Sequence, residues 1–281
     1  MKIVMVMQYG GYATVMKVKD IRLKVIPSKL ANDFVKKYHY SGKVVPNSKL
    51  HFGAFYNNVL HGVLSYGSPL DKRKTIGLVK NTKWNEMLEL NRMAFDDVLP
   101  KNSESRCIAI SIKLIKKNAP HIKWILSFSD CCQCGDGTIY RASGFVLTNI
   151  KKNTTIWEAP NGEVATDISL RLGMKNFNFN KIVTKTVTDK GFLKKNNGAS
   201  SMKIFKEAGY KPLEGYQLRY VYFIDKKKKE DLTVPIIPFS RIKEMGIGMY
   251  KGKKLGIDSL KVKHNISNVE KVVQYQPQCS I

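Results

Sequence analysis

Hydrophobic positions between residues 84 and 145 alternate between strand-like and helix-like patterns. Residues 84–95 are rich in apolar side chains with partial alternation, which predicts a half-buried strand. Residues 103–118 place apolar side chains at helical spacing, and Pro120 disfavours the helical conformation in the residue before it. Residues 124–128 form a short, continuous apolar run that is typical of a strand covered on both faces, and a second helical pattern follows. The segment is therefore predicted to be a β-α-β-α unit.

The edge where this unit binds a ligand can be predicted from the same order. The second strand ends at Ser129-Asp130, and the first helix begins near Ser103 and Ser105, which are natural N-cap residues. Strand ends and helix N-termini converge at one edge of such a sheet, where backbone N–H groups and the helix dipole favour an anion. We therefore expect the functional site at this edge.

The patterns on either side complete a mixed α/β sheet. Residues 71–83 are predicted to be a basic loop, and the remaining elements are a strand at 19–26, a helix at 28–38, a hairpin at 50–56 and 59–66 with an Asn57-Asn58 turn, a strand or strand pair at 145–157 and a strand at 219–224. This order resembles the acyl-CoA N-acyltransferase (GNAT-like) fold, a central mixed sheet flanked by helices. The resemblance predicts an α/β (α+β) fold with a basic insertion and a C-terminal tail.

In the GNAT-like family, the loop before the helix that follows the fourth strand holds the pyrophosphate of CoA with backbone N–H groups. That loop is Pro100–Arg106 here, and it lacks both glycines of the usual Gln/Arg-x-x-Gly-x-Gly/Ala form. Ser103 and Ser105 would supply hydroxyl donors instead, with Arg106 as the counter-charge. The departure leaves open whether acetyl-CoA or a related acyl donor is used.

Composition adds a strong charge to this picture. The chain of 281 residues carries a formal net charge of +26, which favours a polyanionic partner through steering and counterion release. The other explanation of this charge is that the source organism uses lysine heavily in all its proteins, whatever they bind. The segments best suited by charge to contact a nucleic acid are residues 171–211, with ten Lys or Arg and two acidic residues, and Lys226–Lys229.

Changes in polarity, charge and periodicity along the sequence divide the chain into three parts. Residues 1–16 are interpreted as an N-terminal extension, 17–240 as a catalytic domain that includes a basic insertion at 160–210, and 241–281 as a basic tail. No apolar run approaches the roughly 18 residues of a membrane span. The five cysteines are too unevenly spaced for a disulfide framework, so a cytoplasmic setting is expected.

Several ordered motifs carry a closer resemblance. They are the sequence YHYSG at Tyr38–Gly42, LELNRM at Leu88–Met93 with NSES at Asn102–Ser105, SFSD at Ser127–Asp130, GDGTIYRASGF at Gly135–Phe145, and the stretch that starts at Arg219. Together these resemble the Mom family of bacteriophage DNA-modification proteins over about residues 16–241. The resemblance implies a phage or prophage enzyme that converts the N6 amino group of adenine in DNA to a carbamoylmethyl derivative, which protects the DNA from restriction.

The chemistry of that product implies a redox metal. Adenine N6 is a weak nucleophile, and direct acyl transfer would give acetyladenine. A carbamoylmethyl group is joined through its methyl carbon, so an unactivated C–H bond must be broken, and a metal with open coordination positions can do this. Iron is therefore expected, with hard oxygen or imidazole ligands near the strand end.

Four residues are the candidate catalytic groups. Asp130 either caps the turn that follows its strand or acts as a metal ligand or general base. His39 and Tyr40 close the first predicted helix, where a histidine is often only a dipole-satisfying cap. The resemblance makes Tyr40 an iron ligand beside Asp130, and His39 a base or substrate contact. Tyr140 is either helix packing or an active-site hydroxyl.

Two further features concern binding. Arg92 lies on an otherwise apolar strand and needs an anion, which is Glu89, Glu104 or a cofactor phosphate. The sequence Cys131-Cys132-x-Cys134 lacks the second pair of ligands that structural zinc usually takes, so we do not favour a zinc site.

The expected partner is double-stranded DNA, and a homodimer is a further expectation. Because adenine N6 lies within a base pair, the target base must be extruded or single-stranded. The candidates for stacking on it are Tyr38, Tyr56, Tyr66 and Phe177. Two rival functions stay open: a conventional acyltransferase acting on RNA, protein or a small amine, and a non-catalytic nucleic-acid-binding protein.

Overall fold

The structure is a computed structural model that describes residues 16–162, 164–167, 170, 202–247, 249–250 and 253–254. The chain divides into two compact units, one formed by residues 1–150 with 218–281 and the other by residues 151–217. The predicted basic region 171–211 lies outside the described residues except for 202–211, and Phe177 lies outside them as well.

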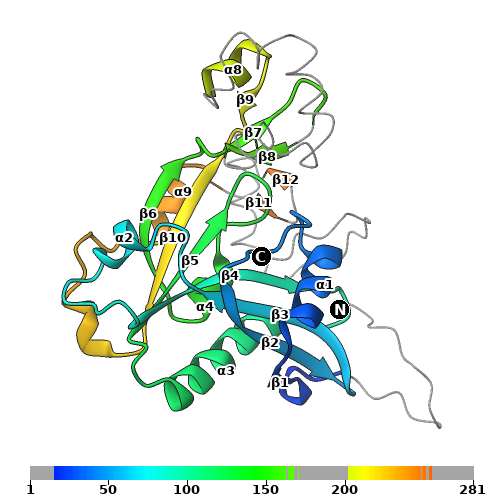
Figure 1. Ribbon diagram of the computed structural model, residues 1–281, viewed down its shortest axis with the longest axis vertical. Helices are drawn as coiled ribbons and strands as arrows, with labels where there is room; N and C mark the ends of the chain where they lie inside the picture. Colours follow the sequence, from blue (N-terminus) through cyan, green and yellow to red (C-terminus); the bar gives the residue numbers. More distant parts are fainter. Residues whose placement is uncertain are drawn as a thin grey trace. The chain divides into compact units, whose positions relative to one another are not determined.

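The first unit is built on a seven-stranded sheet. Its strands follow the order β1 (Arg22–Val25), β2 (Ser48–Tyr56), β3 (Val59–Gly67), β4 (Met87–Phe95), β5 (Trp124–Asp130), β10 (Tyr216–Phe223) and β6 (Val146–Lys152). Strands β1 to β4 pair antiparallel, and β4 pairs parallel with β5. Figure 1 shows the late strand β10 lying between β5 and β6. The predicted mixed sheet is confirmed.

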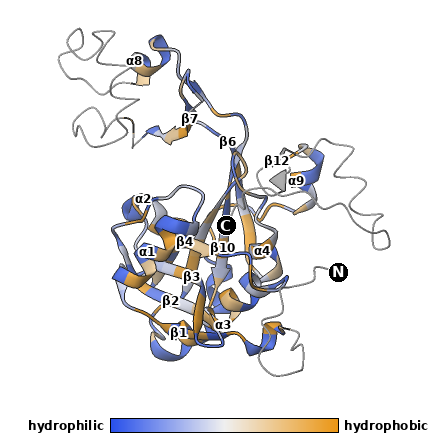
Figure 2. Ribbon diagram, turned by 90° about the vertical axis from the view of Figure 1, so that its right-hand side faces the viewer, coloured by the Kyte–Doolittle hydropathy of each residue, from blue (hydrophilic) through white to orange (hydrophobic). Residues whose placement is uncertain are grey.

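Helices cover both faces of this sheet. Helix α1 (Ser28–Tyr38) packs Phe34 and Val35 against Val63 of β3. Helix α3 (Ser103–Asn118) meets the same strand through a hydrogen bond of 2.6 Å between the hydroxyls of Ser111 and Tyr66. Val63 and Tyr66 are three residues apart on one strand, so their side chains point to opposite faces. In Figure 2, α1 and α3 carry both hydrophilic and hydrophobic residues, as helices with one face on a sheet do.

Local sequence accounts for the connections. The hairpin between β2 and β3 turns at Asn57 and Asn58, both with positive φ (48° and 62°), as a two-residue turn of the predicted kind requires. The segment 71–83, predicted to be a loop, contains the short helix α2 (Lys72–Ile76). Asp71 caps α2 by accepting a hydrogen bond from the backbone N–H of Lys74. A side chain at the cap is thus enough to start one turn of helix in a polar segment.

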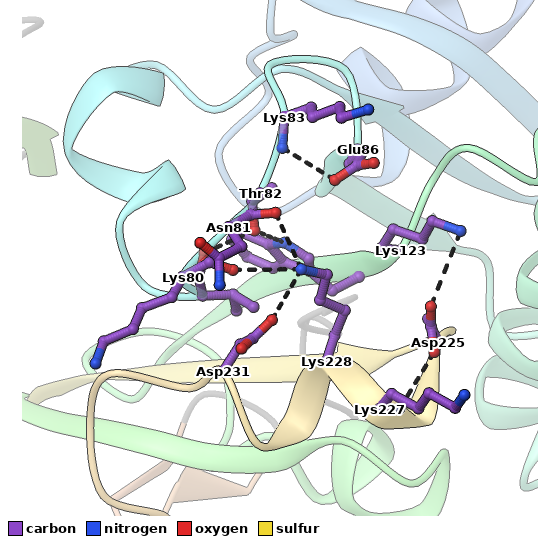
Figure 3. A network of polar contacts seen from close by, with 12 residues as sticks. Lys80, Asn81, Thr82, Lys83, Glu86, Lys123, Asp225, Lys227, Lys228 and Asp231 are labelled. Carbon is purple, nitrogen blue, oxygen red and sulfur yellow. Dashed lines mark hydrogen bonds and ion pairs between the residues drawn. The ribbon is translucent and has the colours of Figure 1, made fainter.

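A lysine joins two basic segments that are far apart in sequence. The short 3₁₀ helix η2 (Lys226–Lys229) follows β10. Figure 3 shows the ammonium group of Lys228 pointing at the carbonyl oxygens of Lys80 and Asn81 and at Asp231. The Lys228 side chain is only 17% exposed. It therefore fastens η2 to the segment between β3 and β4.

The second unit has its own small core. Its sheet consists of β8 (Val164–Thr166), β7 (Ile156–Glu158) and β9 (Lys211–Pro212), with helix α8 at Met202–Glu207. Trp157, Leu170, Phe205 and Tyr210 are buried together there. The remaining described elements belong to the first unit; they are η1 (Val18–Asp20), α4 (Thr138–Ala142), α9 (Ser240–Glu244), β11 (Met249–Tyr250) and β12 (Lys253–Lys254).

Candidate functional site

The candidate site lies where β4 and β5 part. Their parallel pairing runs from Met87 and Trp124 to Glu89 and Leu126, and no later pair of these two strands is recorded, although β4 continues to Phe95. A pocket of about 50 Å³ opens beside residues 90–93 of β4. Strands that separate leave room for a ligand between them. The pocket therefore lies at the same edge of the sheet at which the sequence predicted a site.

A β-bulge shapes the β4 side of the pocket. Ser65 of β3 pairs with Arg92 and the next residue, Tyr66, pairs with Leu90, so Asn91 is the extra residue on β4. A bulge re-aims the side chains beside it. The Asn91 side chain is held in turn, because its Oδ1 accepts from the Ser48 hydroxyl at 3.1 Å. The bulge thus fixes the direction of both pocket residues, Asn91 and Arg92.

The pocket collects five of the predicted site residues from four separate segments. Its complete lining is His39, Tyr40, Leu90, Asn91, Arg92, Met93, Phe128, Asp130, Cys134 and Tyr140. The first two follow α1, Asp130 ends β5, and Tyr140 comes from α4. The predicted cofactor residues Ser103, Ser105 and Arg106 are not part of the lining.

The two carboxylate oxygens of Asp130 have different partners, one in the turn after β5 and one in the pocket. Oδ1 accepts from the backbone N–H of Cys132 at 2.9 Å, which is the turn cap considered from the sequence. Oδ2 receives the Tyr40 hydroxyl at 3.5 Å. Burial, and next to it the charge of Asp130, raises the pKa of the Tyr40 phenol far above its usual value. Tyr40 is therefore a neutral hydrogen-bond donor next to a carboxylate.

His39 is held in one neutral tautomer. The backbone N–H of Ser41 lies 3.1 Å from Nδ1 and can only donate, so Nδ1 is the acceptor and Nε2 carries the proton. Burial, and secondly the charge of Arg92, lowers the pKa of His39 to about 3. Since the basic nitrogen is already occupied, His39 is suited to donate a hydrogen bond from Nε2 rather than to act as a base.

Arg92 is anchored by backbone carbonyls. Its Nε donates to the Lys43 carbonyl at 3.0 Å, and Nη1 donates to the Asn91 carbonyl at 2.9 Å. The ion pairs of the described residues include none between Arg92 and Glu89 or Glu104. Two fixed nitrogens leave the guanidinium able to hold an anion or a carbonyl in the pocket.

Tyr140 packs against other aromatic rings and also lines the pocket. Its ring lies 5.4 Å from Phe145 and 5.2 Å from Tyr220, centroid to centroid, which bears out the packing role. Burial raises the pKa of Tyr140 to about 12, so its hydroxyl stays protonated. The pocket therefore combines three neutral donors, on His39, Tyr40 and Tyr140, with one carboxylate and one guanidinium.

The start of α3 differs from the expectation. The N-cap is Asn102, so the prediction of Ser103 or Ser105 as N-cap is wrong. Asn102 has a φ of 72°, and an asparagine tolerates this left-handed conformation better than most residues, which accounts for a turn without glycine. The hydroxyls of Ser103 and Ser105 donate to the carbonyls of Pro100 and Asn102, because they close the turn themselves.

Four described cysteines differ in their state, and Cys134 is the one that lines the pocket. Cys107, Cys131 and Cys132 are buried free thiols, and burial raises the pKa of Cys107 to about 12. Cys134 is disulfide-bonded, a single bond that the spacing of the cysteines did not predict. Within the described ranges, no three residues of the types His, Cys, Asp and Glu are grouped so as to hold a metal ion.

Two pocket residues were missed from the sequence. Phe128 is 46% exposed on β5, whose other residues are buried. The apolar run around it predicted a strand covered on both faces, so its exposure had no signal in the sequence. Asn91 lies inside the LELNRM motif and could have been noticed as a polar residue on an apolar strand, like its neighbour Arg92.

Comparison with known proteins decides the family. A match to the Mom protein family covers residues 20–241. The chain belongs to the Mom protein family. A curated relative, "Methylcarbamoylase mom" of Escherichia phage Mu, is 36% identical over 150 residues, which is 53% of this chain and 62% of that protein.

Solved structures resemble the chain more loosely. A spermidine/spermine N-acetyltransferase, SpeG of Vibrio cholerae, is 8% identical with a TM-score of 0.39, over 76% of this chain and 98% of its own. FeeM, an N-acyl amino acid synthase from uncultured soil microbes, is 17% identical with a TM-score of 0.37, over 47% of this chain and 82% of its own. No helix in the described part of this Mom-family chain is both long and apolar enough to cross a membrane.

Proposed function

We propose that this Mom-family protein modifies DNA by converting adenine N6 to the carbamoylmethyl derivative, and so protects phage DNA from restriction. The observation that carries the proposal is the pocket where β4 and β5 separate. It gathers His39, Tyr40, Arg92, Asp130 and Tyr140, the residues that the family motifs singled out. The similarity to a methylcarbamoylase of phage Mu supports the same reaction.

The roles of these residues follow from their protonation and contacts. Oδ2 of Asp130, the oxygen on the side of Tyr40, is the group that would accept the proton lost from adenine N6. Tyr140 and the Nε2 of His39 would donate hydrogen bonds to ring nitrogens or to the transferred group. Arg92 would hold the carbonyl or phosphate of an acyl-CoA donor, because a guanidinium binds both in fixed geometry.

Iron belongs to the proposal because, when bound and supplied with a two-electron oxidant, it would provide the chemistry needed to break the C–H bond of the donor. Asp130 and Tyr40, the latter after losing its phenol proton to the metal site, are the side chains that would hold it, since two oxygens 3.5 Å apart fit neighbouring positions around one ion. With two protein ligands, the other positions would remain for substrate and water. At the start of α3, Ser105 would contact the donor through its backbone N–H group and Arg106 through its guanidinium.

The test is nucleoside mass spectrometry on DNA from cells that express the full chain, beside an Asp130→Asn control. We expect an adenine species carrying one acetamido unit with the wild-type protein and none with the control. Acetyladenine would support the conventional acyltransferase instead. Unmodified DNA in both cultures, with folded protein and added iron, would refute the proposed reaction.

A further inference from the structure

An exposed aromatic side chain on β5, an interior strand of the sheet, is not explained by packing. Phe128 is 46% exposed, whereas Leu126 two residues earlier on β5 is fully buried. Burying a phenylalanine contributes roughly 1.5–3 kcal/mol, so an exposed ring on a core strand forgoes part of that stabilisation. Phe128 also lines the pocket, two residues before Asp130. Its exposure is therefore at the site and not on a remote surface.

The ring of Phe128 is open to a ligand in a way that its aromatic neighbours are not. Tyr40 is 39% exposed, but its ring stacks on His39 with centroids 4.3 Å apart. Tyr140 is covered by Phe145 and Tyr220. Phe128 is absent from the aromatic contacts of the described residues. Among the aromatic rings of the pocket, this one has a face available for stacking.

The tyrosines considered from the sequence are less suited to this task. Tyr66 is completely buried and bonded to Ser111. Tyr38 packs on Phe34 at 4.4 Å between centroids. Neither lines the pocket, and Tyr56 does not line it either. Among the described residues, the stacking group is therefore to be sought elsewhere in the pocket lining.

We propose that Phe128 is the platform on which the extruded target base stacks, so that its exocyclic amino group reaches Asp130. This inference rests on the proposed function for the identity of the base. An extruded base loses its stacking in the duplex and regains it on an aromatic or apolar side chain. Phe128 supplies the apolar face and the polar pocket wall supplies the hydrogen bonds, so Phe128 is a substrate-positioning residue.

The test measures base-dependent binding by the full chain. The probes are fluorescently labelled single-stranded oligonucleotides of thymidines with one central adenine, and the same strand with an abasic site at that position. We expect the wild-type protein to bind the adenine strand more tightly than the abasic strand. Phe128→Ala should weaken binding of the adenine strand by about 5- to 150-fold, the range for losing one base–aromatic stack, and leave the abasic strand unchanged.

Matched variants exclude a general loss of structure. Phe128→Trp should keep the preference for adenine, and Phe128→Leu, which retains apolar volume without a π-face, should lose most of it. Val59→Ala truncates another exposed apolar residue, 55% exposed at the hairpin, and should bind both strands as the wild type does. If Phe128→Ala and Phe128→Leu keep the wild-type preference, or the wild type has none, the platform is refuted.

The outcomes separate this inference from the reaction. A preference for adenine that depends on Phe128, in a protein that leaves DNA unmodified, would support the platform and overturn the proposed reaction. If the protein modifies DNA but its preference for adenine does not depend on Phe128, the proposed reaction would be supported and the platform refuted.

Discussion

Glu89 allows a quantitative test of the electrostatics around the pocket. It lies on β4 at the last residue paired with β5, and burial is the main reason why its pKa rises from 4.5 to about 7. The side chain of Asn91 and the charge of Arg92 oppose this rise but do not cancel it. The folded protein therefore prefers Glu89 protonated.

The magnitude follows from this difference in pKa. At about 1.4 kcal/mol per unit, a rise from 4.5 to about 7 corresponds to roughly 3 kcal/mol. Above pH 7, Glu89 is ionised in both folded and unfolded states, and the folded state is destabilised by the full free energy of burying the charge. Below pH 4.5 it is neutral in both, and the cost vanishes. The destabilisation thus grows as the pH rises from 4.5 to 7.

The assay is urea unfolding, followed by tryptophan fluorescence, of the wild type and Glu89→Gln. The neutral glutamine lacks the cost of a buried charge, so the variant should be more stable by roughly 3 kcal/mol at pH 8 and about equal near pH 4.5. Glu230→Gln, at an exposed position of similar chemistry, should stay within about 0.5 kcal/mol at both pH values. A pH-independent difference, or a less stable variant at pH 8, would refute the reasoning.

Three further predictions concern the pocket and the lysine contact. Asp130→Asn and Asp130→Ala should both lower modification at least about 100-fold in a mass-spectrometric assay. Only Asp130→Ala should also lose about 1 kcal/mol of unfolding free energy, because Asn keeps an acceptor for Cys132; equal stabilities would contradict the capping role. His39, with a pKa of about 3 instead of 6.5, should make the protein less stable as the pH falls below 6.5. His39→Gln should remove roughly 3 kcal/mol of that loss at pH 4.5 in urea unfolding, and an unchanged pH dependence would speak against the buried neutral histidine. Lys228→Met should cost about 2 kcal/mol or more, whereas the exposed Lys227→Met should cost less than about 0.5; similar midpoints in thermal unfolding would disprove the contact.

The sequence predicted the elements of the first unit well because their signals are local. Apolar spacing marked α3 and β5, and the Asn57-Asn58 pair marked the hairpin turn. The site residues were found through motifs, and the strand order then placed Asp130 at the edge where a ligand binds. Such predictions need only neighbours in sequence and the general rules of α/β sheets.

What the sequence missed depends on contacts across the fold. The exposure of Phe128 follows from the separation of β4 and β5, which no local pattern encodes. The tautomer of His39 depends on where the Ser41 N–H points after the helix ends. The N-cap at Asn102 was missed because serine and asparagine cap helices about equally well, and only the fold shows that this turn requires a left-handed residue.

The second unit is attached through two neighbouring strands, and this has a consequence for how the protein can vary. β6 leads out of the first sheet and β10 leads back beside it. Thr148 bonds to Arg219 and, further out, the Asn153 N–H reaches the Gly215 carbonyl at 2.9 Å, so the strands run antiparallel and the stem is closed. An insertion whose ends touch can be lengthened, shortened or exchanged with little strain on the fold that carries it. A chain in which a short turn joins residues 153 and 215 would retain β6 and β10 as an ordinary hairpin.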